Sequence, residues 1–283
     1  MIVVERGSGK EFEYKYSGLV KFLYNTFLGR IFLKLLTNKI FANTGALFMK
    51  SCLSKTLASK KIKKYNIDMS QYKNPKYKCY NDFFTREKKQ IMIDSDKDSF
   101  ISPCDSKLMI LKLDEDVSFE VKGSIYNADE IINDSLIKDY KDGYALIFRL
   151  DVNDYHHYLY LDEGTRNDYK FIKGCLHTVQ PIAYDKVKVF HRNSREWCVL
   201  NTKNFGEIIQ VEVGALLVGK IRNNNKTKFK KGEEKGFFEF GGSTIMIFVK
   251  KNTIDFDGDI LSNSQAGKET IVKCGEKIGI KKK

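Results

Sequence analysis

Residues 231–248 read KGEEKGFFEFGGSTIMIF. Apolar residues gather on both sides of a Gly-Gly pair, with Phe237–Phe240 before it and Ile245–Phe248 after it. Short aromatic and β-branched runs are typical of β-strands, and a Gly-Gly pair between two of them is typical of a hairpin turn. The stretch therefore predicts a β-hairpin with its turn at Gly241-Gly242.

Similar segments recur through the second part of the chain. From about residue 100, runs rich in Val, Ile and Phe alternate with Gly, Asn and Asp; they are Tyr144–Leu150, Cys198–Leu200, Ile208–Val213, Leu216–Ile221 and Ile245–Val249. Only Asn127–Asp139 has the pattern of a helix there. We therefore expect a mainly antiparallel β body.

Residues 17–60 have a different character. Apolar residues recur about every four positions, and Lys, Arg and Asn occupy the other positions; the apolar series is Leu19, Leu23, Phe27, Ile31 and Leu35. This spacing predicts amphipathic helices, with charges too frequent for a bilayer span. The predicted fold class is α+β, with a helical region over residues 1–75 and the β body over residues 76–283.

The amino-acid composition limits the kinds of binding partner that the protein is expected to have. The chain has 283 residues, 49 Lys+Arg against 36 Asp+Glu, and a net charge of +13. A basic surface suits nucleic acid or an anionic membrane. Only eight of the basic residues are Arg, the side chain that reads bases in bidentate fashion, so we expect no nucleic-acid partner. The amphipathic helices either pack on a core, their more common fate, or lie on an anionic membrane.

Several familiar sites are excluded. No two of the six Cys lie within four residues of each other, which leaves no zinc-binding spacing, and we expect free thiols and no metal. Gly7-Ser8-Gly9-Lys10 lacks the hydroxyl residue that a phosphate-binding loop places after its Lys. Asp255–Asp259 lacks the glycine and glutamate of a calcium loop. The first residues do not form a secretory signal, which favours a cytosolic location.

Three clusters can carry chemistry together. Ser102-Pro103-Cys104-Asp105 is a proline turn with one carboxylate, and Asp154-Tyr155-His156-His157 holds two of the four His. Adjacent strand residues point to opposite faces, so only one of these two His can face a given site. The third cluster is Gly242-Ser243, where glycine leaves the preceding carbonyl open to attack.

Serine after glycine suits an internal N→O acyl shift. Ser243 can attack the carbonyl of Gly242 if a His accepts its proton and an Asp orients that His. Elimination from the resulting ester would break the chain and leave dehydroalanine, which hydrolyses to a pyruvoyl group. The carbonyl of a pyruvoyl group can accept the electrons that are released when a substrate carrying an amine loses carbon dioxide.

These residues resemble the phosphatidylserine decarboxylase proenzyme family. Eight motifs follow the family's order; they are Asn81–Arg86, Ser102–Asp105, Lys122–Tyr126, Asp154–His156, Thr178–Pro181, Asn193–Arg195, Val213–Ala215 and Gly241–Ile245. The resemblance implies cleavage between Gly242 and Ser243 into a β chain of residues 1–242 and an α chain of residues 243–283. It implies Ser243, Asp105 and His156 as catalytic residues and a covalent pyruvoyl cofactor made from Ser243.

The resemblance also implies partners and a location. The substrate would be phosphatidylserine, converted to phosphatidylethanolamine at the cytoplasmic face of the cell membrane by a peripheral protein. The partners would be an anionic membrane surface, the two chains of the cleaved protein and, as an open alternative, a second copy in a homodimer. We read the net charge of +13 as a basic face toward the membrane.

One departure leaves a choice open. Many family members read D-Y-H-x-x-H, whereas position 159 here is Leu. His156 then serves both cleavage and decarboxylation, or His157 takes one step; we favour His156. We expect His177 and His191 to be structural. Lys122 and Arg195 could bind a lipid phosphate or the substrate carboxylate, but we favour a role as solvated surface charges.

Two other functions fit parts of the pattern. A hydrolase could use an uncleaved Ser243 with His156 and Asp105. A basic lipid-binding module would need none of the three.

Overall fold

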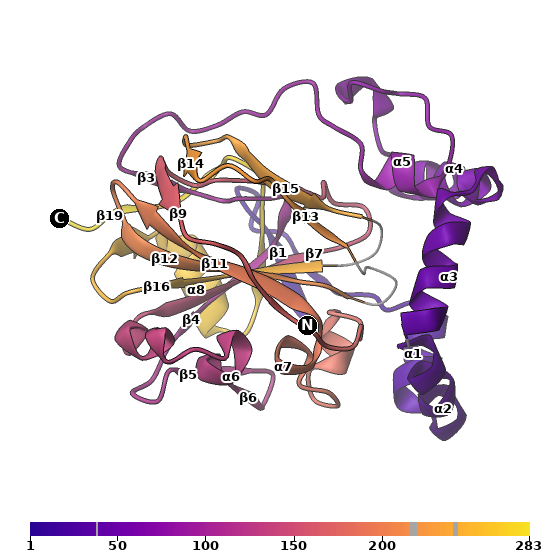
Figure 1. Ribbon diagram of the computed structural model, residues 1–283, viewed down its shortest axis with the longest axis horizontal. Helices are drawn as coiled ribbons and strands as arrows, with labels where there is room; N and C mark the ends of the chain where they lie inside the picture. Colours follow the sequence, from indigo (N-terminus) through magenta and orange to yellow (C-terminus); the bar gives the residue numbers. More distant parts are fainter. Residues whose placement is uncertain (38, 216–219, 240–242) are drawn as a thin grey trace.

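The computed structural model describes residues 1–37, 39–215, 220–239 and 243–283. An eleven-stranded sheet forms its centre (Figure 1). In spatial order its strands are β14 (Lys228–Phe229), β9 (Gly164–Arg166), β11 (Arg195–Thr202), β12 (Gly206–Val213), β16 (Ser243–Val249), β7 (Tyr144–Leu150), β4 (Ser106–Lys112), β18 (Glu269–Val272), β1 (Ile2–Glu5) and β2 (Glu11–Glu13), with β10 (Lys170–Ile172) also paired to β11. Every described pair is antiparallel except β1 with β18.

Three smaller units surround this main sheet. They are the sheet β13 (Ile221–Asn223), β15 (Glu234–Phe238) and β8 (His157–Leu159), the sheet β17 (Ile254–Phe256), β19 (Lys277–Lys281) and β3 (Ser99–Ile101), and the hairpin β5 (Ser118–Val121) and β6 (Ser124–Asn127). The predicted hairpin around Gly241-Gly242 is wrong. β15 pairs with β13 and β8, whereas β16 pairs with β12 and β7, so the chain crosses between two sheets there.

The helices complete the α+β fold. They are α1 (Gly18–Asn25), α2 (Phe27–Leu36), α3 (Lys39–Lys50), α4 (Lys55–Tyr65), α5 (Tyr80–Phe84), α6 (Ala128–Ile132), α7 (Val189–Arg192) and α8 (Gly258–Gln265), with short 3₁₀ helices η1 (Cys52–Ser54), η2 (Met69–Gln71), η3 (Ser135–Tyr140) and η4 (Pro181–Ala183). The helix predicted over Asn127–Asp139 is split into α6 and η3 by Asn133, whose φ of 51° ends α6.

The central strands are buried on both faces. In β16, Ile245, Ile247 and Val249 enter one apolar cluster, and Met246 and Phe248 enter the other. The first cluster fills the space between the main sheet and its smaller partners, and the second lies under α6 and α7. Two-sided burial explains why this strand is a continuous apolar run rather than an alternating one.

The amino-terminal helices lie along one side of the β body (Figure 1). Ser17 and Thr26 cap α1 and α2 by accepting hydrogen bonds from the amides of Val20 and Gly29, at 3.3 and 2.9 Å. These helices confirm the helical prediction over residues 17–60. The residues before them belong to the sheet, since β1 pairs with β18 and β2 pairs with β1.

Candidate active site

The candidate nucleophile lies where the central strand β16 begins, at the edge of the main sheet that the strand ends form. Ser243 is the first residue of β16 and lies opposite Leu150, the last residue of β7. Strand alternation puts its side chain on the same face of the sheet as Ile245, toward the first apolar cluster, which lies between the main sheet and its smaller partners. Ser243 is fully buried, and its Oγ has no hydrogen-bond partner among the described residues. Such a buried hydroxyl costs about 1–3 kcal/mol in desolvation, which functional sites tolerate.

The other two predicted residues lie at the same edge. β4 flanks β7 on the side away from β16, with Lys107 opposite Arg149, so Asp105 just before β4 lies beside the end of β7. His156 follows β7 after a short turn, and its carbonyl oxygen accepts a hydrogen bond from the Phe238 amide at 3.1 Å. The fold therefore gathers Ser243, Asp105 and His156 from three strand ends.

The ring of His156 is buried and oriented by the backbone. Its Nδ1 lies 2.9 Å from the carbonyl oxygen of Asp154. A carbonyl oxygen only accepts, so Nδ1 carries the proton and Nε2 presents a lone pair. Nε2 is buried and has no partner among the described residues. Burial, with a contribution from the charge of Arg86, lowers the pKa of His156 well below its usual 6.5. The ring is therefore a neutral base at physiological pH.

His157 faces the opposite side of the same strand. Its ring is stacked between Tyr155 and Phe237, with centroid distances of 5.0 and 4.9 Å. Its Nδ1 lies 2.8 Å from the Glu234 carboxylate and its Nε2 lies 3.1 Å from the carbonyl oxygen of Thr85. Both ring nitrogens are thus occupied, unlike those of His156.

The Asp105 carboxylate has partners other than His156. Its Oδ2 accepts a hydrogen bond from Lys88 Nζ at 2.9 Å, and its Oδ1 accepts one from the Cys274 amide at 2.9 Å. The structure therefore brings Asp105 to the site, yet the hydrogen bond that orients His156 comes from a backbone carbonyl.

A buried ionic network supports the turn that carries His156. Lys107 Nζ lies 2.6 Å from Asp154 Oδ2 and 3.0 Å from Asp151 Oδ2. Arg149 binds Asp151 and also Glu269, at 2.6 and 2.5 Å. Burial alone would raise the pKa of Asp151, but Arg149 and Lys107 lower it to about 2. The turn is therefore fixed by ion pairs to β4 and β7.

A segment that the sequence motifs contained, but to which we assigned no role, packs on this site. The Phe84 ring lies 3.8 Å from the His156 ring, and Arg86 Nη2 donates to the Asp154 carbonyl oxygen at 3.1 Å. Arg86 thus shares with His156 the carbonyl that fixes its tautomer. Only the motif at Asn81–Arg86 could have signalled this, since propensity says nothing about such long-range contacts.

The remaining predicted residues lie elsewhere or are structural. Arg195 is buried and donates to backbone carbonyls, including that of Ile131 at 2.5 Å, so it is not the surface charge that we expected. His191 Nε2 lies 3.0 Å from the Asn127 carbonyl oxygen, and His177 Nδ1 lies 3.3 Å from Tyr24 Oη. Lys122 has a left-handed φ of 52° in the turn between β5 and β6. Gly242 lies outside the described residues.

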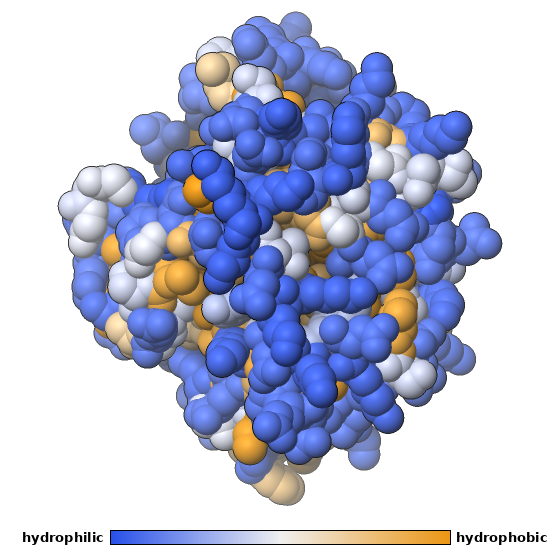
Figure 2. Space-filling model, turned by 90° about the vertical axis from the view of Figure 1, so that its left-hand side faces the viewer, coloured by the Kyte–Doolittle hydropathy of each residue, from blue (hydrophilic) through white to orange (hydrophobic). Residues whose placement is uncertain are grey.

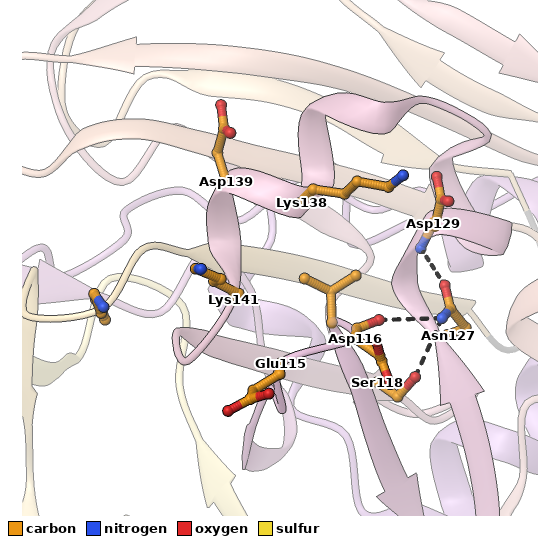
Figure 3. A pocket seen from close by; sticks show the side chains of 10 residues that line it. Glu115, Asp116, Ser118, Asn127, Asp129, Lys138, Asp139 and Lys141 are labelled. Atoms are coloured by element: carbon orange, nitrogen blue, oxygen red, sulfur yellow. Dashed lines mark hydrogen bonds between the residues drawn. The ribbon is translucent and has the colours of Figure 1, made fainter.

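Within the described parts of the chain, neither a metal-binding group nor the surface pocket described next lies at this edge of the sheet. Across the described ranges, no group of three or more His, Cys, Asp or Glu is placed to hold a metal ion. A surface pocket of about 910 Å³ lies between the β5–β6 hairpin and η3, lined by polar side chains such as Asp116, Asn127 and Lys138 (Figure 3). It contains none of the three candidate residues.

Comparisons with known proteins agree on one family. The family model for phosphatidylserine decarboxylase matches residues 80–280. "Phosphatidylserine decarboxylase proenzyme 2" of Clostridium acetobutylicum is 48% identical over 273 residues, covering 95% of this chain and 94% of that protein. "Phosphatidylserine decarboxylase proenzyme" of Clostridium botulinum (strain Hall) is 41% identical and covers 100% of both chains. The chain belongs to the phosphatidylserine decarboxylase family.

Proposed function

We propose that this protein is a precursor that cuts itself between Gly242 and Ser243 and then decarboxylates phosphatidylserine to phosphatidylethanolamine. One observation carries the proposal: the Ser243 hydroxyl and the His156 Nε2 lone pair are both buried at one edge of the sheet, and neither has a partner among the described residues. A hydroxyl and a neutral base without competing partners are what an acyl shift requires.

The cleavage follows from the roles of these two groups. His156 Nε2 accepts the Ser243 proton while Oγ attacks the Gly242 carbonyl carbon. The C–N bond then breaks, the proton passes to the new amine, and an ester joins the two segments. Loss of the Ser243 Cα proton and of the Gly242 carboxylate leaves dehydroalanine. Water converts it to a pyruvoyl group with release of ammonia.

The surroundings of Ser243 fit such a group. It would stand at the start of the α chain, in a buried position opposite Leu150 of β7. A pyruvoyl carbonyl supplies an electron sink for the electrons released when carbon dioxide leaves an amine-bearing substrate. His156 Nε2 would accept a proton from the ammonium group of the substrate and return it to the product, since Nε2 has no partner among the described residues and the ring is oriented by the Asp154 carbonyl.

The fold would keep both products of cleavage together. The α chain would contain β16, which lies between β12 and β7, and β18, which lies between β4 and β1. All four neighbours belong to the β chain. Cutting one bond at the sheet edge therefore leaves these hydrogen-bonded ladders intact.

The amino-terminal helices supply a surface for the membrane. Large apolar side chains are exposed along α1, α2, α3 and η1; they are Leu19, Phe22, Phe27, Leu28, Ile31, Phe32, Leu35, Leu47, Phe48 and Leu53. Exposed Lys and Arg flank them, including Lys21, Arg30 and Lys34. An apolar face bordered by basic residues suits the interface of an anionic bilayer.

Two further observations bear on this surface. Among the described residues, no helix has the length and hydropathy to cross a bilayer. The face of the molecule that lies away from these helices is mostly hydrophilic, with only scattered apolar residues (Figure 2). We therefore propose peripheral binding through α1–α3 at the cytoplasmic face of the membrane.

The test is a comparison of serine variants. Wild-type protein should release carbon dioxide from phosphatidylserine in mixed micelles, and Ser243→Ala should release none. Ser262→Ala, which removes an exposed hydroxyl in α8, is the matched control and should equal wild type. Labelling of wild-type Ser243 by a fluorophosphonate would instead indicate a hydrolase with an uncleaved chain and would contradict the proposal.

A further inference from the structure

The cleavage scheme leaves one buried ion pair of the site without a role. Lys88 Nζ lies 2.9 Å from Asp105 Oδ2, and the exposed fractions of the two side chains are 19% and 11%. Lys88 is the sole Lys or Arg within ion-pair distance of Asp105 among the described residues. The other partner of the carboxylate is a neutral backbone amide, that of Cys274.

Lys88 is held in place by the residue beside His156. Its Nζ lies 4.7 Å from the centre of the Tyr155 ring, and its backbone amide donates to the Tyr155 hydroxyl at 3.4 Å. An isolated antiparallel bridge to Tyr72 fixes the backbone of Lys88 from the other side. The contacts with Tyr155 and Tyr72 therefore position the ammonium group of Lys88 next to Asp105.

The other titratable groups around Asp105 leave its charge balance to Lys88. The thiols of Cys104 and Cys274 lie close to it, and burial raises the pKa of both, so both are neutral near pH 7. Lys107, two residues along the chain, is already paired with Asp151 and Asp154. Without Lys88, the carboxylate would keep one described hydrogen-bond donor, the amide of Cys274, and its Oδ2 would lose the partner that orients it.

We propose that Lys88 is a positioning residue of the self-cleavage site, which holds the Asp105 carboxylate in its orientation while His156 takes the Ser243 proton. The imidazolium formed in that step lies in a buried setting with Arg86 and Lys107 nearby, and these two cations disfavour it. Asp105, just before β4, is the carboxylate that Lys88 holds at this end of the strands. This inference rests on the proposed self-cleavage.

The experiment follows cleavage in chains made by cell-free synthesis, stopped and transferred to buffers from pH 6 to pH 9. Lys88→Met should cleave at least about tenfold more slowly than wild type across this range, because Asp105 Oδ2 loses the partner that orients it, while the melting temperature of the uncleaved Ser243→Ala chain should not change when Lys88→Met is added. Lys88→Arg should restore most of the rate at pH 7. Lys73→Met, which breaks the exposed Lys73–Glu87 pair on the neighbouring segment, should match wild type.

The outcomes separate three explanations. A merely structural role predicts that Lys88→Met lowers the melting temperature of the uncleaved Ser243→Ala chain and that Lys88→Arg does not restore the cleavage rate; that result overturns the proposal. A wild-type rate for Lys88→Met at all pH values overturns it as well. A wild-type chain that stays intact at every pH refutes self-cleavage itself, and the role of Lys88 with it.

Discussion

The edge of the main sheet and the amino-terminal helices depart in opposite ways from the usual distribution of polar and apolar groups. At the sheet edge, polar atoms of Ser243 and His156 are buried and have no partners in the part of the chain that the structure describes. On α1 and α2, side chains such as Phe27 and Leu28 are apolar and yet 72% and 61% exposed. Native proteins usually avoid both arrangements, because each costs stability. The contrast supports the two proposals, chemistry at the first region and contact with lipid at the second.

The largest expected effect separates the two adjacent histidines at the sheet edge. His156→Ala should slow self-cleavage by about 10²–10⁴-fold, because it removes the general base. His157→Ala should still cleave, since its ring nitrogens are occupied on the other face. A time course on denaturing gels measures both. Normal cleavage of His156→Ala together with an intact His157→Ala chain would reverse our assignment.

The second effect concerns the helices. Replacing Phe27, Leu28, Ile31 and Phe32 together by Gln should weaken binding to anionic vesicles by at least about 100-fold, as each apolar side chain loses about 1 kcal/mol or more of burial. Cosedimentation with the vesicles measures the change. Self-cleavage of the same variant should remain at the wild-type rate, because none of these residues contacts the sheet edge.

The body offers a matched control for this change. The exposed apolar side chains outside the amino-terminal helices include Met92, Ile125, Phe171 and Ile280. Their joint replacement by Gln should leave vesicle binding unchanged. Equal losses for both sets of variants would show that apolar exposure in general, rather than the helical face, binds the vesicles.

The smallest expected effect is that of pH on the rate of wild-type self-cleavage, which should change little. His156 acts in its neutral form, which predominates above its pKa, and burial lowers that pKa well below 6.5. The base is therefore available throughout pH 6.5–8, and it is lost only as the pH falls through the lowered value. The wild-type cleavage rate should change by less than about threefold over this range. A half-maximal rate near pH 6.5 would indicate an exposed histidine instead.

The sequence predicted the parts of this comparison that depend on local pattern. The helical region and the central strands β7, β12 and β16 followed from apolar spacing, and they are confirmed. The hairpin at Gly241-Gly242 was wrong because strand partners are chosen by distant residues, and β16 pairs with β7 and β12. A turn signal identifies a break between strands, but it does not say whether the two strands share a sheet.

The candidate site shows the same limit. Motif residues placed Ser243, Asp105 and His156 together as candidates, and the strand ends bring them to one edge. The acceptor for His156 Nδ1 is a backbone carbonyl, which no side-chain pattern could reveal. The ion pair of Lys88 with Asp105 joins segments whose proximity depends on the complete fold.

The mass of the purified wild-type protein under denaturing conditions tests the central claim most directly. We predict two chains, of residues 1–242 and 243–283, the smaller with a pyruvoyl group in place of Ser243 and therefore resistant to Edman degradation. A single chain with the mass of all 283 residues would contradict self-cleavage.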